Sequence, residues 1–154
     1  MYLGVVDEAA TRDLRRRVLR PNLPPDAPLP GDELTNGVHL GALADDGTAL
    51  CTCFVYPDPC PWLPGRSAWH LRQMATDERH RGEGLGAKIV DLAVRYVREQ
   101  GADLLWCNAR ETAVGFYRRQ GFVVHGEVFT DERHTIPHRR MHRELAAPAT
   151  SSTG

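Results

Sequence analysis

The sequence predicts an α/β (α+β) fold in one domain. Short apolar runs bounded by turn residues indicate strands, apolar residues at helical spacing indicate helices, and a glycine-rich turn joins a strand to the longest helical pattern. The chain of 154 residues is long enough to bury a core of its own. We expect a single domain over residues 1–145 and a disordered tail over residues 146–154, which is poor in large apolar residues.

The first half of the chain contains a predicted opening strand, a helix and a hairpin. The expected elements are a strand over 2–6, a helix over 8–20, an irregular loop over 22–36 and strands over 38–44 and 48–56. Pro21 stops the helix, and Asp45, Asp46 and Gly47 favour the left-handed backbone of a tight hairpin turn. The proline-rich loop is long for a compact domain, so we expect it to have a functional role.

The second half alternates strands and helices around the glycine-rich turn. The expected elements are a strand over 68–76, a helix over 85–100, a strand over 104–109, a helix over 113–120, a strand over 122–129 and extended chain over 134–145. Gly101 and Gly121 end the two helices. Gln73 is a polar residue in what should be a buried central strand.

The stretch from Arg79 to Ala87, RHRGEGLGA, is the strongest functional signal. Gly82, Gly84 and Gly86 let the backbone turn tightly, and the helix that follows begins with amides that have no partner within the helix. Helix N-termini attract anions, and the flanking arginines add charges that suit phosphate oxygens. The predicted ligand is a phosphate or pyrophosphate.

The spacing separates several phosphate-binding patterns. A P-loop requires a hydroxyl after the lysine, but Ile89 follows Lys88. A relaxed dinucleotide pattern fits Gly82, Gly84 and Ala87, with an aspartate about twenty residues on, but too little chain follows for a doubly wound domain. That pattern predicts affinity for NAD. A plain turn between strand and helix is the remaining structural alternative.

The order of motifs resembles the GNAT superfamily of acyl-CoA-dependent N-acetyltransferases. The segment 81–86 (RGEGLG) is similar to motif A of that family, and the segment 113–122 (AVGFYRRQGF), which follows the run 104–109 (LLWCNA), is similar to motif B. The resemblance covers roughly residues 68–129. It implies a mixed, mostly antiparallel sheet of six to seven strands, splayed between the fourth and fifth, flanked by helices, with acetyl-CoA as co-substrate.

The resemblance also implies site residues. Backbone groups of the fourth strand would meet the pantetheine and the thioester carbonyl, and the amides of the glycine turn would hold the pyrophosphate. Tyr117 matches the family tyrosine near the sulfur, and a phenol can protonate a departing thiolate. The expected coenzyme contacts are Met74, Ala75, Thr76, Arg79, Arg81, Gly82, Glu83, Gly84, Leu85, Gly86, Ala87, Asn108 and Tyr117.

Alternatives remain open for several of these residues. Tyr117 could instead be a core aromatic, although the neighbouring Phe116 can fill that packing role and leave Tyr117 freer to face a cleft. Many relatives carry Asn where this chain has Arg110, so Asn108 is the nearest substitute, and Thr112 could cap the helix.

The general base is predicted to be His138, whose ordinary pKa suits the task. It lies in a segment, Ile136-Pro137-His138, that is similar to the C-terminal region of some small GNAT proteins. The other candidates are Glu111, Glu127, His70 and a water chain relayed through Gln73.

Composition excludes several other classes of protein. The formal net charge of −1 argues against a nucleic-acid partner, and the absence of a long apolar run or leader pattern argues against a membrane span and for the cytoplasm. The four cysteines lack CxxC spacing and read as buried free thiols. His134, His138 and His142 recur every fourth residue, but an extended strand would place successive ones about 13 Å apart, so no metal is predicted.

The predicted function is acetyl transfer from acetyl-CoA to a primary amine by direct attack in a ternary complex, with Tyr117 protonating the thiolate. The alternative is a non-catalytic acyl-CoA-binding or regulatory module of the same fold. The expected acceptor is a small-molecule amine or a protein N-terminus, with the proline-rich loop over 22–36 as a wall of the acceptor site, and a homodimer is included among the expected assemblies.

Overall fold

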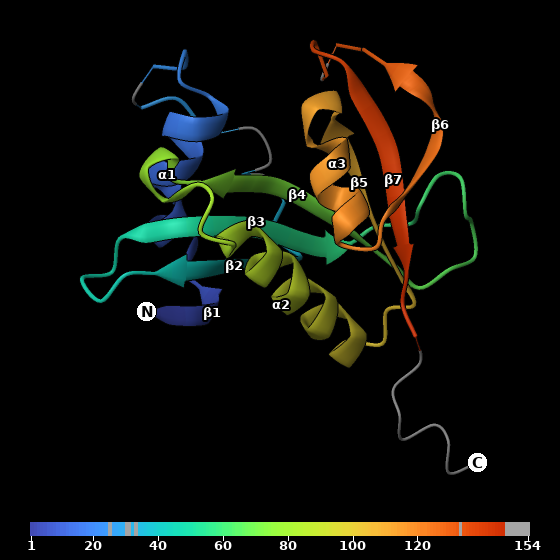
Figure 1. Ribbon diagram of the computed structural model, residues 1–154, viewed down its shortest axis with the longest axis horizontal. Helices are drawn as coiled ribbons and strands as arrows, with labels where there is room; N and C mark the ends of the chain where they lie inside the picture. Colours follow the sequence, from blue (N-terminus) through green and yellow to red (C-terminus); the bar gives the residue numbers. More distant parts are fainter. Residues whose placement is uncertain (25, 30–31, 33, 133, 147–154) are drawn as a thin grey trace. The chain divides into compact units, whose positions relative to one another are not determined.

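The structure is a computed structural model that describes residues 1–24, 26–29, 32, 34–132 and 134–146 (Figure 1). All of the predicted tail except Ala146 lies outside the described residues. The elements in chain order are β1 (Tyr2–Val6), α1 (Glu8–Leu19), β2 (Val38–Leu43), β3 (Ala49–Pro57), β4 (Ala68–Thr76), the 3-10 turn η1 (Glu78–His80), α2 (Leu85–Glu99), β5 (Leu104–Arg110), the 3-10 turn η2 (Glu111–Ala113), α3 (Val114–Arg119), β6 (Val123–Phe129) and β7 (His138–Glu144).

The strands form a seven-stranded sheet in the order β1-β2-β3-β4-β5-β7-β6. β4 and β5 are parallel, and the other neighbours are antiparallel, which confirms the predicted mixed sheet. The parallel ladder pairs Ala68 with Leu104, Trp69 with Leu105 and His70 with Trp106. β4 continues for a further six residues after His70, to Thr76.

The chain forms two compact units. The first unit contains Met1–Tyr56 and Leu71–Ala93, and the second contains Pro57–His70 and Val94–Gly154. The division passes through β4 and through α2, so each of these elements contributes residues to both units. The single domain over residues 1–145 stays a prediction.

The first unit packs α1 against strands β3 and β4. Leu14 is buried with Ala49 and Ala75, and Val18 and Leu19 pack against this cluster, as the helical spacing predicts. The β2–β3 hairpin forms at the predicted turn, where Ala44 N–H donates to the Thr48 carbonyl at 2.8 Å. Burial of these apolar side chains is the main force that fixes α1 on the strands.

The second unit contains the antiparallel ladder β5–β7–β6 and helix α3. Trp106 of β5 is buried with Cys60, Ala68 and Leu104, and Trp62 packs against this cluster edge-on to Trp106. Trp62 also donates from Nε1 to His142 Nδ1 at 2.9 Å. Its role is therefore packing of the 57–65 loop onto the strands.

Helix α2 buries one broad stripe along its length. Its buried residues are Leu85, Ile89, Val90, Ala93, Val94 and Val97. Gly101, with a φ of +93°, ends the helix, and Ala102 N–H donates back to the Val97 carbonyl at 2.9 Å.

Among the described helices, none combines the length and the apolar character needed to cross a bilayer.

Candidate functional site

The glycine-rich turn lies in the first unit, between η1 and α2. Gly82 and Gly84 have φ values of +83° and +78°, a left-handed backbone that glycine adopts without strain. Lys88 N–H donates to the Gly84 carbonyl at 3.2 Å, so Gly84 precedes the first helical residue. The amides of Leu85, Gly86 and Ala87 are therefore the first three of the helix, which have no acceptor within it.

This turn is open on its outer side. Among the described residues, a side-chain carbon added to Gly82 or Gly84 would meet no atom within 4 Å. Both glycines and the adjoining Arg81 and Glu83 are exposed, whereas Leu85 is buried and fixes the start of α2 in the core. The helix start is thus rigid on one side and accessible on the other, as an anion site requires.

Asp77 anchors the segment that leads into the turn. Its carboxylate is fully buried and accepts hydrogen bonds from Arg79 N–H at 2.9 Å and from Arg79 Nε and Nη2, both at 3.2 Å. Arg17 of α1 approaches the same carboxylate through Nη2 at 3.4 Å. These bonds, those of Arg79 foremost, hold the pKa of Asp77 well below its usual range, so the group is a carboxylate at neutral pH.

The two arginines that flank the turn differ. Arg79 is paired with Asp77, so part of its charge is already neutralised within the first unit. Arg81 is exposed and follows η1 directly, next to Gly82. Glu83 also carries charge in the turn, and its carboxylate lies 3.1 Å from His80 Nδ1. Arg81 is therefore the better placed of the two arginines to meet an anion at the helix start.

Three consecutive arginines of α1 contact three different segments. Arg15 is buried and donates to Gln73 of β4, Arg16 donates to the carbonyls of Pro24 and Ala27, and Arg17 reaches Asp77. A run of arginines on a surface helix usually forms a solvated face. In the structure it instead fastens β4, the proline-rich loop and the glycine turn to one helix.

Gln73 has a left-handed backbone in the middle of β4. Its φ is +59°, and it is the sole non-glycine residue with positive φ among those described. Such a conformation costs about 1–2 kcal/mol for a residue with a β-carbon. Arg72, Gln73 and Met74 are all half-buried, so the alternation of a regular strand is interrupted there. The amides of Met74, Ala75 and Thr76, predicted to contact the coenzyme, follow this bend.

Tyr117 lies on α3 in the second unit. It is only 5% exposed and packs edge-on against Phe116 at 5.0 Å and Phe122 at 5.4 Å between ring centroids. Phe116 is the more exposed of the neighbouring pair. The expectation that Phe116 would fill the core and free Tyr117 was therefore wrong, because the helix turns the tyrosine ring inward beside Phe122.

His138 begins β7 and has a defined tautomer. Its Nδ1 donates to the Ile136 carbonyl at 2.7 Å, which leaves Nε2 as the nitrogen that can accept a proton. Burial, and to a lesser extent the charges of His134 and Arg110, lower the pKa of His138 below its ordinary value of 6.5. The imidazole is therefore neutral at pH 7, as a general base must be.

The other residues considered for the site have different surroundings. Asn108 is half-buried on β5 opposite Arg140 of β7, and Glu111 and Glu127 are exposed. His70 is buried, stacks on Trp106 at 3.7 Å and lies 3.2 Å from an Asp58 carboxylate oxygen, which is a packing role. The prediction that Thr112 caps a helix was wrong: Thr112 lies within η2, and α3 begins after Ala113.

The histidines of the C-terminal segment are closer than expected. His134 precedes β7, and its ring lies 4.6 Å from that of His138, because the chain folds back before the strand begins. The estimate of about 13 Å for an extended segment was wrong for this pair. Within the described part of the chain, no three His, Cys, Asp or Glu side chains are grouped so that they could hold a metal ion.

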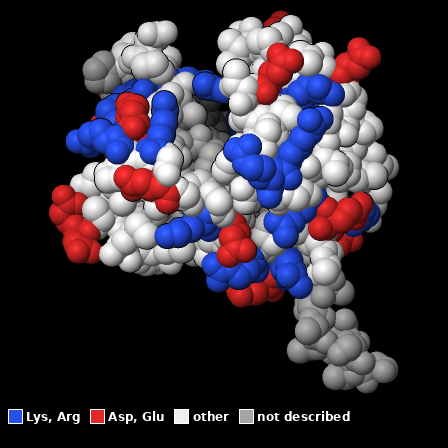
Figure 2. Space-filling model, in the orientation of Figure 1, with Lys and Arg blue, Asp and Glu red and all other residues white. Residues whose placement is uncertain are grey.

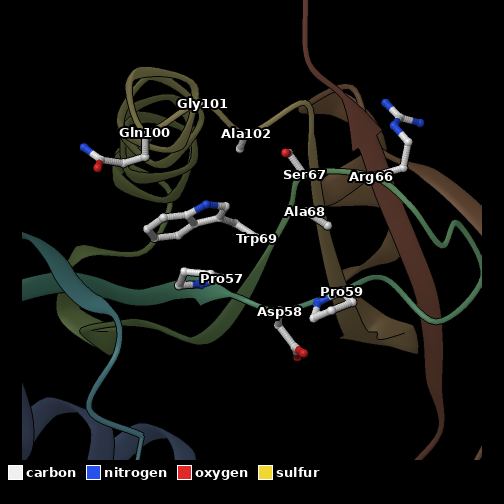
Figure 3. A pocket seen from close by; sticks show the side chains of 10 residues that line it. All are labelled: Pro57, Asp58, Pro59, Arg66, Ser67, Ala68, Trp69, Gln100, Gly101 and Ala102. Atoms are coloured by element: carbon white, nitrogen blue, oxygen red, sulfur yellow. The ribbon is translucent and has the colours of Figure 1, made fainter.

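A hollow of about 280 Å³ lies in the second unit beside the end of α2 (Figure 3). Trp69 projects between Pro57 and Gln100 in that view, and Ala102 lies above it, next to Gly101. The residues that line the hollow include none of the predicted site residues. The hollow is therefore a feature separate from the glycine turn, Tyr117 and His138.

Two contacts that shape the site, Arg17 with Asp77 and Arg15 with Gln73, could not be predicted from the sequence. Asp77 could have been noted as a cap of η1, since Asp before a helical turn accepts a backbone N–H. The hydrogen bond that Asp77 accepts from Arg17 could not have been predicted, because that arginine is 60 residues away in sequence. The same holds for Arg15 and Gln73, which are separated by 58 residues.

Comparison with known proteins assigns the family. The model of the Acetyltransferase (GNAT) family matches residues 9–122. The Bacillus subtilis (strain 168) protein named "Uncharacterized N-acetyltransferase YitI" is 33% identical over 120 residues, which cover 77% of this chain and 80% of that protein. Streptothricin acetyltransferase of Streptomyces lavendulae is 37% identical over 67 residues, or 39% of this chain and 35% of that protein.

A solved structure shows the same fold. The crystal structure of an aminoglycoside 6'-N-acetyltransferase complexed with coenzyme A superposes with a TM-score of 0.73 at 14% identity, over 96% of this chain and 99% of that one. The family match spans the glycine turn and the tyrosine helix that the sequence singled out. The chain therefore belongs to the GNAT family of acetyltransferases, and it is an acyltransferase.

Proposed function

We propose that the protein transfers an acetyl group from acetyl-CoA to a primary amine. The observation that carries the proposal is the open helix start after Gly84, where the amides of Leu85, Gly86 and Ala87 lie beside the exposed Arg81. Aligned amides at a helix N-terminus are suited to the pyrophosphate of coenzyme A. Because Gly82 and Gly84 carry no side chain, the phosphates can approach the backbone closely.

The reaction sets three requirements. A donor must stabilise the negative charge that builds on the thioester oxygen, a base must accept a proton from the ammonium, and an acid must protonate the departing thiolate. We assign these roles to the amides of Met74 to Thr76, to His138 Nε2 and to the Tyr117 hydroxyl. The amine attacks directly while both substrates are bound, and Asn108 contacts the pantetheine.

The acceptor is an amine on a small molecule or at a protein N-terminus. Two proteins similar to this chain are named for streptothricin and aminoglycoside acetylation. On the face drawn in Figure 2, basic and acidic side chains lie next to one another. The loop between α1 and β2, which Arg16 fastens through two carbonyls, is our candidate wall of the acceptor site.

Calorimetric titration with acetyl-CoA, coenzyme A and NAD tests the proposal. We expect binding of the first two and none of NAD, and an Arg81→Glu variant should bind coenzyme A at least about ten-fold more weakly, since it reverses one charge beside a dianion. A thiol-release screen over amine acceptors then tests catalysis. Binding without release for every acceptor would favour the non-catalytic acyl-CoA-binding module, and no binding would refute the proposal. A cytoplasmic location and a homodimer stay predictions.

A further inference from the structure

We propose that Arg15 is a positioning residue for the reaction. Its guanidinium holds Gln73 in the left-handed conformation that directs the following amides of β4. The inference rests on the proposed function, because the amides of Met74, Ala75 and Thr76 matter only if they meet the acyl group. It concerns the first unit alone, which contains α1 and this part of β4.

The bend at Gln73 needs an external support. A residue with a β-carbon disfavours a φ of +59°. In a strand, a left-handed residue changes the direction in which the following peptide groups point. A relaxed Gln73 would therefore return the amides of Met74 to Thr76 to the directions of a regular strand.

Arg15 supplies that support through a direct bond. Its Nη1 donates to Gln73 Oε1 at 2.9 Å, and the side chain of Arg15 is only 2% exposed. The guanidinium is itself fixed by Thr11 Oγ1, which accepts from Nε at 2.9 Å, and by Asp32 Oδ1, which accepts from Nη1 at 3.2 Å. Glu8 is a further ion-pair partner, at 3.3 Å from Nη2. A buried, multiply bonded arginine is a rigid donor.

Helix α1 also holds the strand on the other side of the bend. Leu14, the residue before Arg15, is buried against Ala75, two residues after Gln73. After Ala75, the Thr76 hydroxyl lies 3.3 Å from Cys51 Sγ, and Asp77 N–H donates to the Leu50 carbonyl at 2.8 Å. The strand is thus fixed beyond the bend by β3 and α1, and Arg15 contacts the residue at the bend itself.

A double-mutant cycle tests the inference. Arg15→Met keeps an unbranched apolar side chain and removes its donors, and Gln73→Gly lets residue 73 adopt positive φ without support. We expect Arg15→Met to lower kcat about ten- to hundred-fold in the natural sequence, on the scale for misplaced catalytic groups, and less than about three-fold in the Gln73→Gly background. Arg16→Met is the matched control, because Arg16 binds loop carbonyls instead of β4, and its effect should be the same in both backgrounds.

Amide NMR provides a readout that does not need activity. The ¹⁵N–¹H resonances of Met74, Ala75 and Thr76 should shift in Arg15→Met and return toward their Gln73→Gly positions in the double variant. Arg15→Gln, which stays polar but ends two atoms short of the guanidinium nitrogens, allows the same comparison if the methionine variant is too unstable.

The outcomes separate the two claims. An unchanged kcat and unchanged resonances in the Arg15 variants would overturn the inference, and so would an equal loss of kcat in both residue 73 backgrounds. If the natural protein neither binds acetyl-CoA nor releases thiol, the proposed function fails, while the shift and return of the resonances would still support the link between Arg15 and the bend.

Discussion

Replacement of Asp77 by asparagine tests how the glycine turn is held. The carboxylate is fully buried and accepts three bonds from Arg79 and one from Arg17. Asn keeps the shape but loses the charge, and it can turn an NH₂ group toward a guanidinium. Loss of charge-assisted bonds in a buried network typically costs about 1.5–3 kcal/mol. Much of Arg79 is exposed, so we take about 2 kcal/mol, which lowers Tm by about 4–8 °C for a chain of this length.

The same variant should weaken coenzyme A binding about three- to ten-fold, because the turn is less well preorganised. Thermal melts followed by circular dichroism and titration calorimetry measure the two effects. The pH dependence provides a further check: the pKa of Asp77 is held below its ordinary 3.8, so its contribution is complete above that pH and is lost as pH falls toward the lowered value. The difference in Tm between natural protein and variant should shrink below about pH 4. A Tm within 1 °C and a coenzyme Kd within two-fold would refute this account of Asp77.

Three further changes probe the residues assigned to binding and chemistry. Glu83→Gln should tighten coenzyme A binding about two- to five-fold by calorimetry, since it removes a negative charge at an assumed distance of about 8 Å from the pyrophosphate, and the gain should fade in high salt; weaker binding would contradict this. Tyr117→Phe should lower turnover by ten-fold or more in a thiol-release assay and leave the Kd of acetyl-CoA nearly unchanged, and full turnover would remove it from the mechanism. The pKa of His138 lies below 6.5, so kcat/KM should decrease with falling pH only below pH 6.5. This acid-side decrease should be absent in His138→Gln, and a decrease that persists in that variant would assign the base elsewhere.

Local patterns predicted most of the elements. The bounds of β1 and β4 agree with the sequence prediction, those of β2 and α2 differ by one residue at one end, and β3 is shifted by one residue at both ends. These elements have clear periodicity and turn residues, so local information suffices. The extended segment over 134–145 was predicted too long, because it includes His134 and Pro137, and β7 begins only at His138.

The candidate site was predictable only in part. The glycine turn and Tyr117 stand in recognisable motifs, but the direction of a side chain depends on tertiary packing: the Tyr117 ring points inward beside Phe122, and the more exposed ring is that of Phe116. The bend at Gln73 is the clearest example. Nothing local favours positive φ in a glutamine, and its partner Arg15 comes from a helix distant in sequence.

The comparison of two glycine-to-alanine variants tests the central claim most directly. Gly84 and Gly65 have φ values of +78° and +85°, and among the described residues a β-carbon at either would meet no atom within 4 Å. Alanine should therefore cost each position a similar strain of about 1 kcal/mol, but only Gly84 precedes the helix start proposed to hold the pyrophosphate. Calorimetry should show coenzyme A binding weakened about ten-fold by Gly84→Ala and unchanged by Gly65→Ala. Equal affinities for both variants and the natural protein would contradict the proposed site.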